Sequence, residues 1–158
     1  MKDVLKPTLK SISLFDEFSD DELFAMLDLL DPVEVKAGDC IVRQDEPGEC
    51  MFVILQGKAK VIHRAPGRNI ELADLEAGDF FGELALVDEG PRSADVEAVE
   101  DCLMLSLSQG VVRSLAGVYP SAAFKLMLAV GRRMVQRLRA NNRKYIDSLL
   151  AASEHVSE

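Results

Sequence analysis

The sequence is poor in histidine, a residue that many metal and nucleophile sites require. His63 and His155 are the only two histidines among the 158 residues, and they lie far apart in the chain. Metal sites in barrel enzymes such as cupins usually need clustered histidines or carboxylates, and nucleophilic catalysis by Ser/His/Asp or Cys/His arrangements needs a histidine beside the nucleophile. We therefore expect no enzyme, no metal ion and no cofactor.

Cysteine and long apolar runs are also scarce. Cys40, Cys50 and Cys102 are odd in number and form no Cys-x-x-Cys pair, which argues against disulfides and indicates buried thiols in a reducing cytoplasm. No apolar run approaches the roughly 20 residues of a membrane-spanning helix, and the first residues lack the order of a secretory signal. We expect a cytoplasmic protein that does not contact a membrane.

Charge is unevenly distributed along the chain. Residues 1–120 carry 11 Lys/Arg and 24 Asp/Glu, whereas residues 121–158 carry 7 and 3. The acidic body should repel nucleic acid, because DNA binding depends on neutralising phosphates. We interpret the basic cluster between Arg132 and Lys144 as a solvated helix face, and we expect no direct nucleic-acid binding.

The N-terminal part predicts a helix with a defined start. Ser19 and Glu22 have the spacing of a capping box, and the apolar residues over 23–30 have helical spacing. Asp31-Pro32 should end this helix, because proline disfavours a helical conformation in the residue before it.

The middle of the chain has the turn spacing of an all-β domain. Five glycines between Gly38 and Gly78 recur at intervals of about ten residues, and short apolar runs such as 51–55 and 72–75 lie between them. This spacing predicts an antiparallel sandwich or barrel, continued by strands over 94–99 and 102–107. Ala37-Gly38-Asp39 recurs as Ala77-Gly78-Asp79, which suggests one turn used twice.

The C-terminal part predicts a short helix over 108–116 and a long helix from about Tyr119. A heptad seam continues over more than three heptads of the long helix. Its positions are Phe124, Leu128, Gly131, Val135, Leu138, Asn142, Tyr145 and Leu149. We favour a homodimer through this seam; the alternative is one amphipathic helix lying on its own barrel.

The segment over residues 80–94 has the composition of a phosphate site. Gly82 allows a close approach of ligand to backbone, and the amides of Leu84 and Ala85 at a helix start would form an anion cradle. Arg92 offers a fork of donors that matches phosphate oxygens.

Glu83 is the unexpected member of this segment, because a carboxylate should repel a phosphate. It fits only if it accepts a hydrogen bond from a hydroxyl, such as a ribose 2′-OH. An acidic acceptor, an amide cradle and one arginine together suit a ribose that bears a single phosphate charge.

Residues 81–85 (Phe-Gly-Glu-Leu-Ala) followed by residues 91–94 (Pro-Arg-Ser-Ala) resemble the phosphate-binding cassette of the cyclic nucleotide-binding domain family. The likeness extends from Leu14-Phe15 to the long final helix, and it implies a β-roll flanked by helices. It implies that Glu83 holds the ribose 2′-hydroxyl, that Arg92 and Ser93 hold the cyclic phosphate beside Ala94, and that the Gly82, Leu84 and Ala85 backbone forms the cradle. The same alignment implies Val61, Leu72 and Ala73 at the base and sugar, and Arg133 from the long helix.

The chain departs from catabolite activators at the long helix. Those proteins place short hydroxyl side chains against the adenine, where this sequence has Arg137 and Leu138. No helix-turn-helix follows the long helix in this sequence, and either a cAMP or a cGMP receptor fits the hydroxyl after Arg92. We favour cAMP.

We expect a mainly β chain with flanking α-helices: an antiparallel β-roll or jelly-roll barrel with an N-terminal helix and a long C-terminal helix. Residues 1–117 should form the roll with its N-terminal helical segment, 118–150 a lid and dimerisation helix, and 151–158 a polar tail. The expected function is a cyclic nucleotide receptor that switches this helix toward an unknown downstream protein. The alternatives are the ligand-binding part of a transcription regulator without its DNA-binding domain, and a structural dimerisation module that binds no nucleotide.

Overall fold

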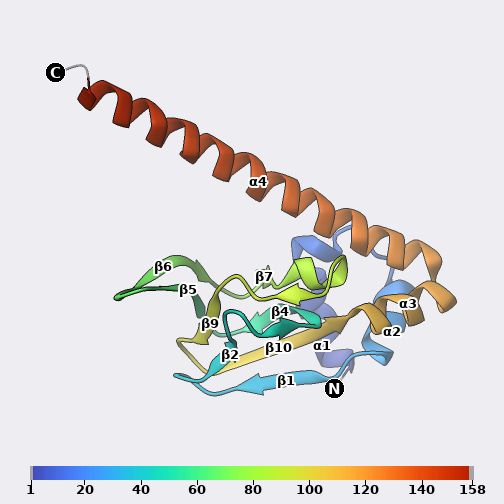
Figure 1. Cartoon of the computed structure of the whole chain (residues 1–158). Helices are drawn as coiled ribbons and strands as arrows, with labels where there is room; N and C mark the ends of the chain where they lie inside the picture. Colours follow the sequence, from blue (N-terminus) through green and yellow to red (C-terminus); the bar gives the residue numbers. More distant parts are fainter. Residues whose placement is uncertain (1, 157–158) are drawn as a thin grey trace.

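The computed structural model describes residues 2–156 and consists of antiparallel sheets with helices at both ends of the chain (Figure 1). The helical elements are α1 (Lys2–Lys10), η1 (Ser13–Phe15), α2 (Asp20–Asp28), η2 (Glu83–Leu86), α3 (Gln109–Val118) and α4 (Pro120–Val156). The strands are β1 (Pro32–Val35), β2 (Cys40–Val42), β3 (Pro47–Gly48), β4 (Cys50–Gln56), β5 (Ala59–Ala65), β6 (Arg68–Leu75), β7 (Phe80–Phe81), β8 (Gly90–Pro91), β9 (Asp95–Ala98) and β10 (Cys102–Ser108). None of the described helices has an apolar stretch long enough to span a bilayer.

Two four-stranded sheets build the β-roll, in the orders β1-β10-β4-β7 and β2-β9-β5-β6, and β3 pairs with β8. All of these pairings are antiparallel, as the turn spacing predicts. The repeated Ala-Gly-Asp turn is confirmed. The backbone amide of Asp39 donates to the Lys36 carbonyl at 3.1 Å, and that of Asp79 donates to the Glu76 carbonyl at 3.0 Å.

The buried side chains form two cores. One lies between the sheets and contains Ile54, Val96 and Met104. The larger one packs α1, η1, α2, α3 and the first turns of α4 against β4 and β10. Cys102 is buried, but Cys40 and Cys50 are half-buried, so the expectation of three buried thiols is correct for one of them.

The capping box at the start of α2 is confirmed. The Glu22 amide donates to Ser19 Oγ at 3.2 Å, and the Ser19 amide donates to Glu22 Oε1 at 3.0 Å. Glu22 also binds α4, because Lys125 Nζ lies 2.7 Å from its Oε1 and Ser121 Oγ donates to its Oε2 at 3.0 Å. This buried carboxylate therefore fixes the start of α4 to the N-terminal helices.

Helix α4 packs on the body only along its first half, and Figure 1 shows its second half extending past the sheets. Ala122, Leu126 and Val130 are buried, whereas every residue from Leu138 to Val156 is exposed. The seam side chains are 37–67 % exposed. They are Phe124, Leu128, Val135, Leu138, Tyr145 and Leu149. The alternative of a helix lying on its own barrel is therefore correct for the first half of α4, but the face that packs there is not the seam.

Residues 151–156 of the expected polar tail continue α4 as helix, and Ser157 and Glu158 lie outside the described residues. Helical spacing gave no stop signal here, because the segment contains no proline or glycine. The division of the chain into a roll and a lid helix remains an expectation.

Candidate functional site

The turn at Gly82 connects β7 to η2 and has a conformation that only glycine adopts easily. Its φ is +75°, in the left-handed region. A Cβ at this position would lie 2.5 Å from Arg92 Nη1 and 3.1 Å from the Cys50 carbonyl oxygen. Gly82 is therefore required twice, by its backbone angle and by the arginine that lies against it.

The backbone after Gly82 presents donors that the described chain does not use. The amides of Glu83 and Leu84 form no hydrogen bond with any described residue. The Ala85 amide donates to the Gly82 carbonyl at 3.2 Å, which corrects the expectation that it is free. The reason is the short helix itself, because the first internal bond of η2 closes on Gly82.

Arg92 lies across this turn and is held by backbone groups. Its Nη2 donates to the Cys50 carbonyl at 2.8 Å, and a Cβ on Gly48 would lie 2.6 Å from its Nε. The backbone of Arg92 is bonded on both sides, to Glu46 and Asp45, at 2.8 Å each. Within the described residues no carboxylate lies within 4 Å of its guanidinium. The charge is therefore oriented toward the cradle and available to an anion.

Glu83 is buried beside the same turn and is bound by α4. Its side chain is 11 % exposed, and its Oε1 accepts a hydrogen bond from Arg137 Nη1. Arg137 Nη2 also donates to the Phe80 carbonyl at 2.8 Å, and its guanidinium lies 5.1 Å from the centre of the Phe80 ring. Because Oε2 of Glu83 bonds to no described residue, the carboxylate retains acceptor capacity.

The expected base and sugar residues lie on β5 and β6, which belong to the other sheet than β7. Val61 of β5 is half-buried and pairs directly with Ala73 of β6. Leu72 lies where the β5–β6 register shifts and is 58 % exposed. Ser93 and the buried Ala94 connect β8 to β9, which pairs with β5. Val61 packs against the core that contains Phe81, next to Gly82, whereas no hydrogen bond or ion pair among the described residues joins Leu72 or Ala73 to the turn.

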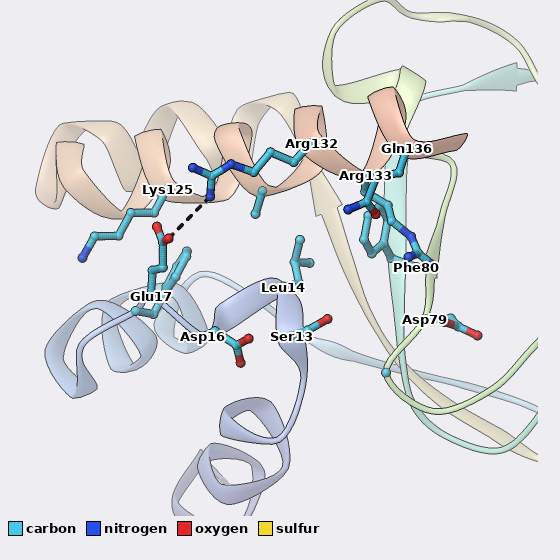
Figure 2. A pocket seen from close by; sticks show the side chains of 13 residues that line it. Ser13, Leu14, Asp16, Glu17, Asp79, Phe80, Lys125, Arg132, Arg133 and Gln136 are labelled. Carbon is cyan, nitrogen blue, oxygen red and sulfur yellow. Dashed lines mark hydrogen bonds and ion pairs between the residues drawn. The ribbon is translucent and has the colours of Figure 1, made fainter. Parts of the chain in front are cut away.

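Arg133 lies in a separate groove, one helical turn before Arg137. The groove has a volume of about 380 Å³ and lies between α4, η1 and the turn before β7. Figure 2 shows Arg133 and Gln136 pointing toward Phe80, while Arg132 reaches Glu17 with a nitrogen–oxygen distance of 3.4 Å. Arg133 forms no ion pair within residues 2–156. The arginine of α4 that hydrogen-bonds the turn is thus Arg137, and a contact of Arg133 with a ligand remains a prediction.

Comparison with known families shows to which family the chain belongs. The model of the cyclic nucleotide-binding domain matches residues 32–118, more than half of the chain. The chain belongs to this family. The match begins at β1 and ends at the last residue of α3, so the cyclic nucleotide-binding domain contains the Gly82 turn, Glu83 and Arg92.

Curated relatives of the domain include bacterial regulators and animal kinases. The chain is 29 % identical over 127 residues to a CRP-like cAMP-activated global transcriptional regulator of Mycobacterium tuberculosis, covering 80 % of this chain and 57 % of that protein. It is 33 % identical over 102 residues to human cGMP-dependent protein kinase 2, covering 61 % of this chain and 13 % of the kinase. The chain therefore spans less than two thirds of both relatives.

Among solved structures, the domain is similar to the N-terminal domain of a transcriptional regulator from Streptomyces coelicolor. The TM-score is 0.74 at 30 % identity, and the likeness covers 84 % of this chain and 94 % of that structure. The antiparallel β-roll is therefore the fold of the family, and in this chain the long helix α4 follows the matched residues.

Two contacts were not predicted from the sequence: that of Arg137 with Glu83 and that of His63 with Ser93. Arg137 and Arg133 are four residues apart on one helix face, so helical spacing alone could not decide which of them reaches Glu83. His63 entered the sequence analysis only as one of two isolated histidines, and its Nδ1 lies 3.2 Å from the Ser93 carbonyl oxygen. The signal that could have found His63 is its alternation with Val61 along β5.

Proposed function

We propose that this domain is a cytoplasmic receptor for a cyclic nucleotide, and that it binds cAMP in preference to cGMP. The observation that carries the proposal is the Gly82 turn, where the guanidinium of Arg92, without a carboxylate partner, lies beside two unbonded amides. Such a group of donors suits a phosphate that carries one negative charge.

The buried carboxylate of Glu83 supports a ribose ligand rather than a free phosphate. With Oε1 bound to Arg137, Oε2 can accept a hydrogen bond from a ribose 2′-hydroxyl. We assign the cyclic phosphate to Arg92, Ser93 and the amide cradle, and the base to the strand surface that carries Val61, Leu72 and Ala73. The preference for cAMP draws support from the cAMP-activated mycobacterial relative.

Ligand binding would act on α4 through Arg137. Arg137 hydrogen-bonds Glu83 and so connects it to α4. Every described residue of α4 after Arg137 is exposed. A ligand that binds Glu83 and the Phe80–Glu83 turn therefore changes the surroundings of Arg137, and with them the helix that a downstream protein would meet.

We test the receptor proposal by isothermal titration of cAMP and cGMP into the wild type, Arg92→Ala and Arg113→Ala. Arg113 lies exposed on α3, forms no ion pair within the described residues, and serves as the matched control. Loss of one charged phosphate contact costs about 1.5–3 kcal/mol, so R92A should bind cAMP about 10- to 150-fold more weakly. R113A should bind like the wild type. A wild type that binds neither nucleotide, or an R92A variant with unchanged affinity, contradicts the proposal.

The exposed seam of α4 supports a homodimer, because six large apolar side chains at heptad spacing lack a partner in the described chain. Multi-angle light scattering at micromolar concentration should give twice the chain mass for the wild type. Leu138→Glu should shift the protein to monomer, because it places a charge in the seam. Asn141→Glu, on the same exposed turn but outside the seam, is the control and should remain dimeric. A monomeric wild type contradicts the dimer.

A further inference from the structure

His63 lies beside the residue that follows the phosphate-binding arginine. The antiparallel β5–β9 ladder pairs Val61 with Val96 and Ile62 with Asp95, and β9 begins at Asp95. Beyond that end of the ladder, the His63 ring reaches back to the chain before β9, where its Nδ1 lies 3.2 Å from the Ser93 carbonyl oxygen.

Strand alternation places the ring on the face of β5 that carries Ala59 and Val61. Successive side chains of a strand alternate between faces. Ala59 belongs to the core between the sheets and Val61 packs against it, so His63 occupies the next position of the same row. A nucleoside whose phosphate is held by Arg92 would therefore meet Val61 and His63 as neighbours on one wall.

The hydrogen bond to Ser93 fixes the chemistry of the imidazole. A carbonyl oxygen only accepts, so Nδ1 must carry the proton of this bond. In the neutral ring the other nitrogen, Nε2, is then a pure acceptor. Nε2 bonds to no described residue, and the ring is half-buried. The strand face that carries Val61 thus also carries one oriented acceptor, Nε2, that the described chain leaves unused.

We infer that His63 is a base-recognition residue, whose Nε2 accepts a hydrogen bond from the exocyclic amino group of the purine. The inference rests on the proposed function, because it requires a cyclic nucleotide bound at Arg92. Adenine and guanine both carry such an amino group, and hypoxanthine and unsubstituted purine do not. His63 would therefore favour amino purines over their amine-free analogues.

Two ligand pairs that differ only in the amino group test this role. The pairs are cAMP with the cyclic phosphate of purine riboside, and cGMP with cIMP. Affinities are measured for the wild type, His63→Phe, His63→Gln and, as control, His155→Phe, which replaces the exposed histidine near the end of α4. Thermal unfolding of each variant establishes that it is folded.

In one of the two pairs the wild type should bind the amine ligand about five- to tenfold more tightly than its analogue, as one hydrogen bond predicts. In H63F this ratio should fall to about one, whereas H63Q, which keeps an acceptor oxygen, should retain part of it. H155F should behave like the wild type. A role of His63 in folding alone would weaken both members of a pair equally. Equal ratios in the wild type and H63F, for both pairs, would overturn the inference and leave the receptor proposal standing; a wild type that binds no cyclic nucleotide overturns both.

Discussion

Two buried glutamates, Glu22 and Glu83, are each bound by a cation of α4, and they differ in how completely their oxygens are used. Glu22 accepts from Ser19 and Lys125 on one oxygen and from Ser121 on the other. Glu83 is bonded within the described residues by Arg137 alone, on one oxygen. Both side chains are nearly inaccessible, with exposed fractions of 5 % and 11 %.

The difference separates a structural carboxylate from one with capacity for a ligand. A buried charge is costly unless it is fully hydrogen-bonded, and Glu22 meets this condition within the chain. Burial alone would raise the pKa of Glu22, but hydrogen bonds from Lys125, Ser19 and Ser121 lower it to about 2. Glu83 meets the condition only in part, which is what a residue that binds a hydroxyl in the complex requires.

Exchanging each carboxylate for its amide should affect mainly stability at Glu22 and mainly ligand binding at Glu83. Glu22→Gln should lower the free energy of unfolding by about 3 kcal/mol, since the shift of the Glu22 pKa from 4.5 to about 2 corresponds to this amount. Glu83→Gln should change it by less than about 1 kcal/mol and weaken cAMP binding about tenfold or more. Urea unfolding and calorimetric titration measure the two effects. A stable E22Q variant would show that the Lys125 contact contributes little.

The contribution of Glu22 to the free energy of unfolding should depend on pH. The pKa of Glu22 in the folded state lies below its ordinary value of 4.5, so its stabilisation is complete above about pH 5. It is lost as the pH falls through 4.5 toward 2, where the unfolded state takes up the proton first. The stability difference between the wild type and E22Q should therefore shrink over this range. A difference that stays constant down to pH 3 would contradict the assignment.

The elements that local chemistry determines were predictable from the sequence. The Ser19–Glu22 capping box, the strands between the glycine turns and the helix after Ser108 all follow from signals within a few residues, and the structure confirms them. The end of α4 was not predictable in this way, because residues 151–156 have neither a stop signal nor a tertiary contact.

The site was predictable where one continuous segment builds it. Gly82 and Arg92 lie in a single motif, and they are in contact in the structure. Arg137 and His63 depend on how distant elements are placed: the path of α4 over the body selects Arg137 over Arg133, and the β5–β9 register brings His63 to Ser93. Such side-chain placement is a property of tertiary packing, which a motif does not encode.

Gly131 offers the smallest change, and it lies both in the seam and on α4 between Lys125 and Arg137, the cations that bind the two glutamates. A Cβ at this position would meet no atom within 4 Å. Gly131→Ala should therefore raise the free energy of unfolding by roughly 1 kcal/mol, the difference in helix propensity between the two residues.

The same variant also tests whether α4 bends when cAMP binds. If the ligand acts by bending α4 between its Glu22 anchor and its Glu83 contact, a stiffer helix at residue 131 should weaken cAMP binding, by at most the same 1 kcal/mol or about fivefold. Gly117→Ala in α3, where a Cβ also meets nothing within 4 Å, is the control for a helical glycine outside α4. Unchanged cAMP affinity in G131A, together with the expected gain in stability, would mean that α4 moves as a rigid body about its Glu22 anchor rather than by bending at Gly131.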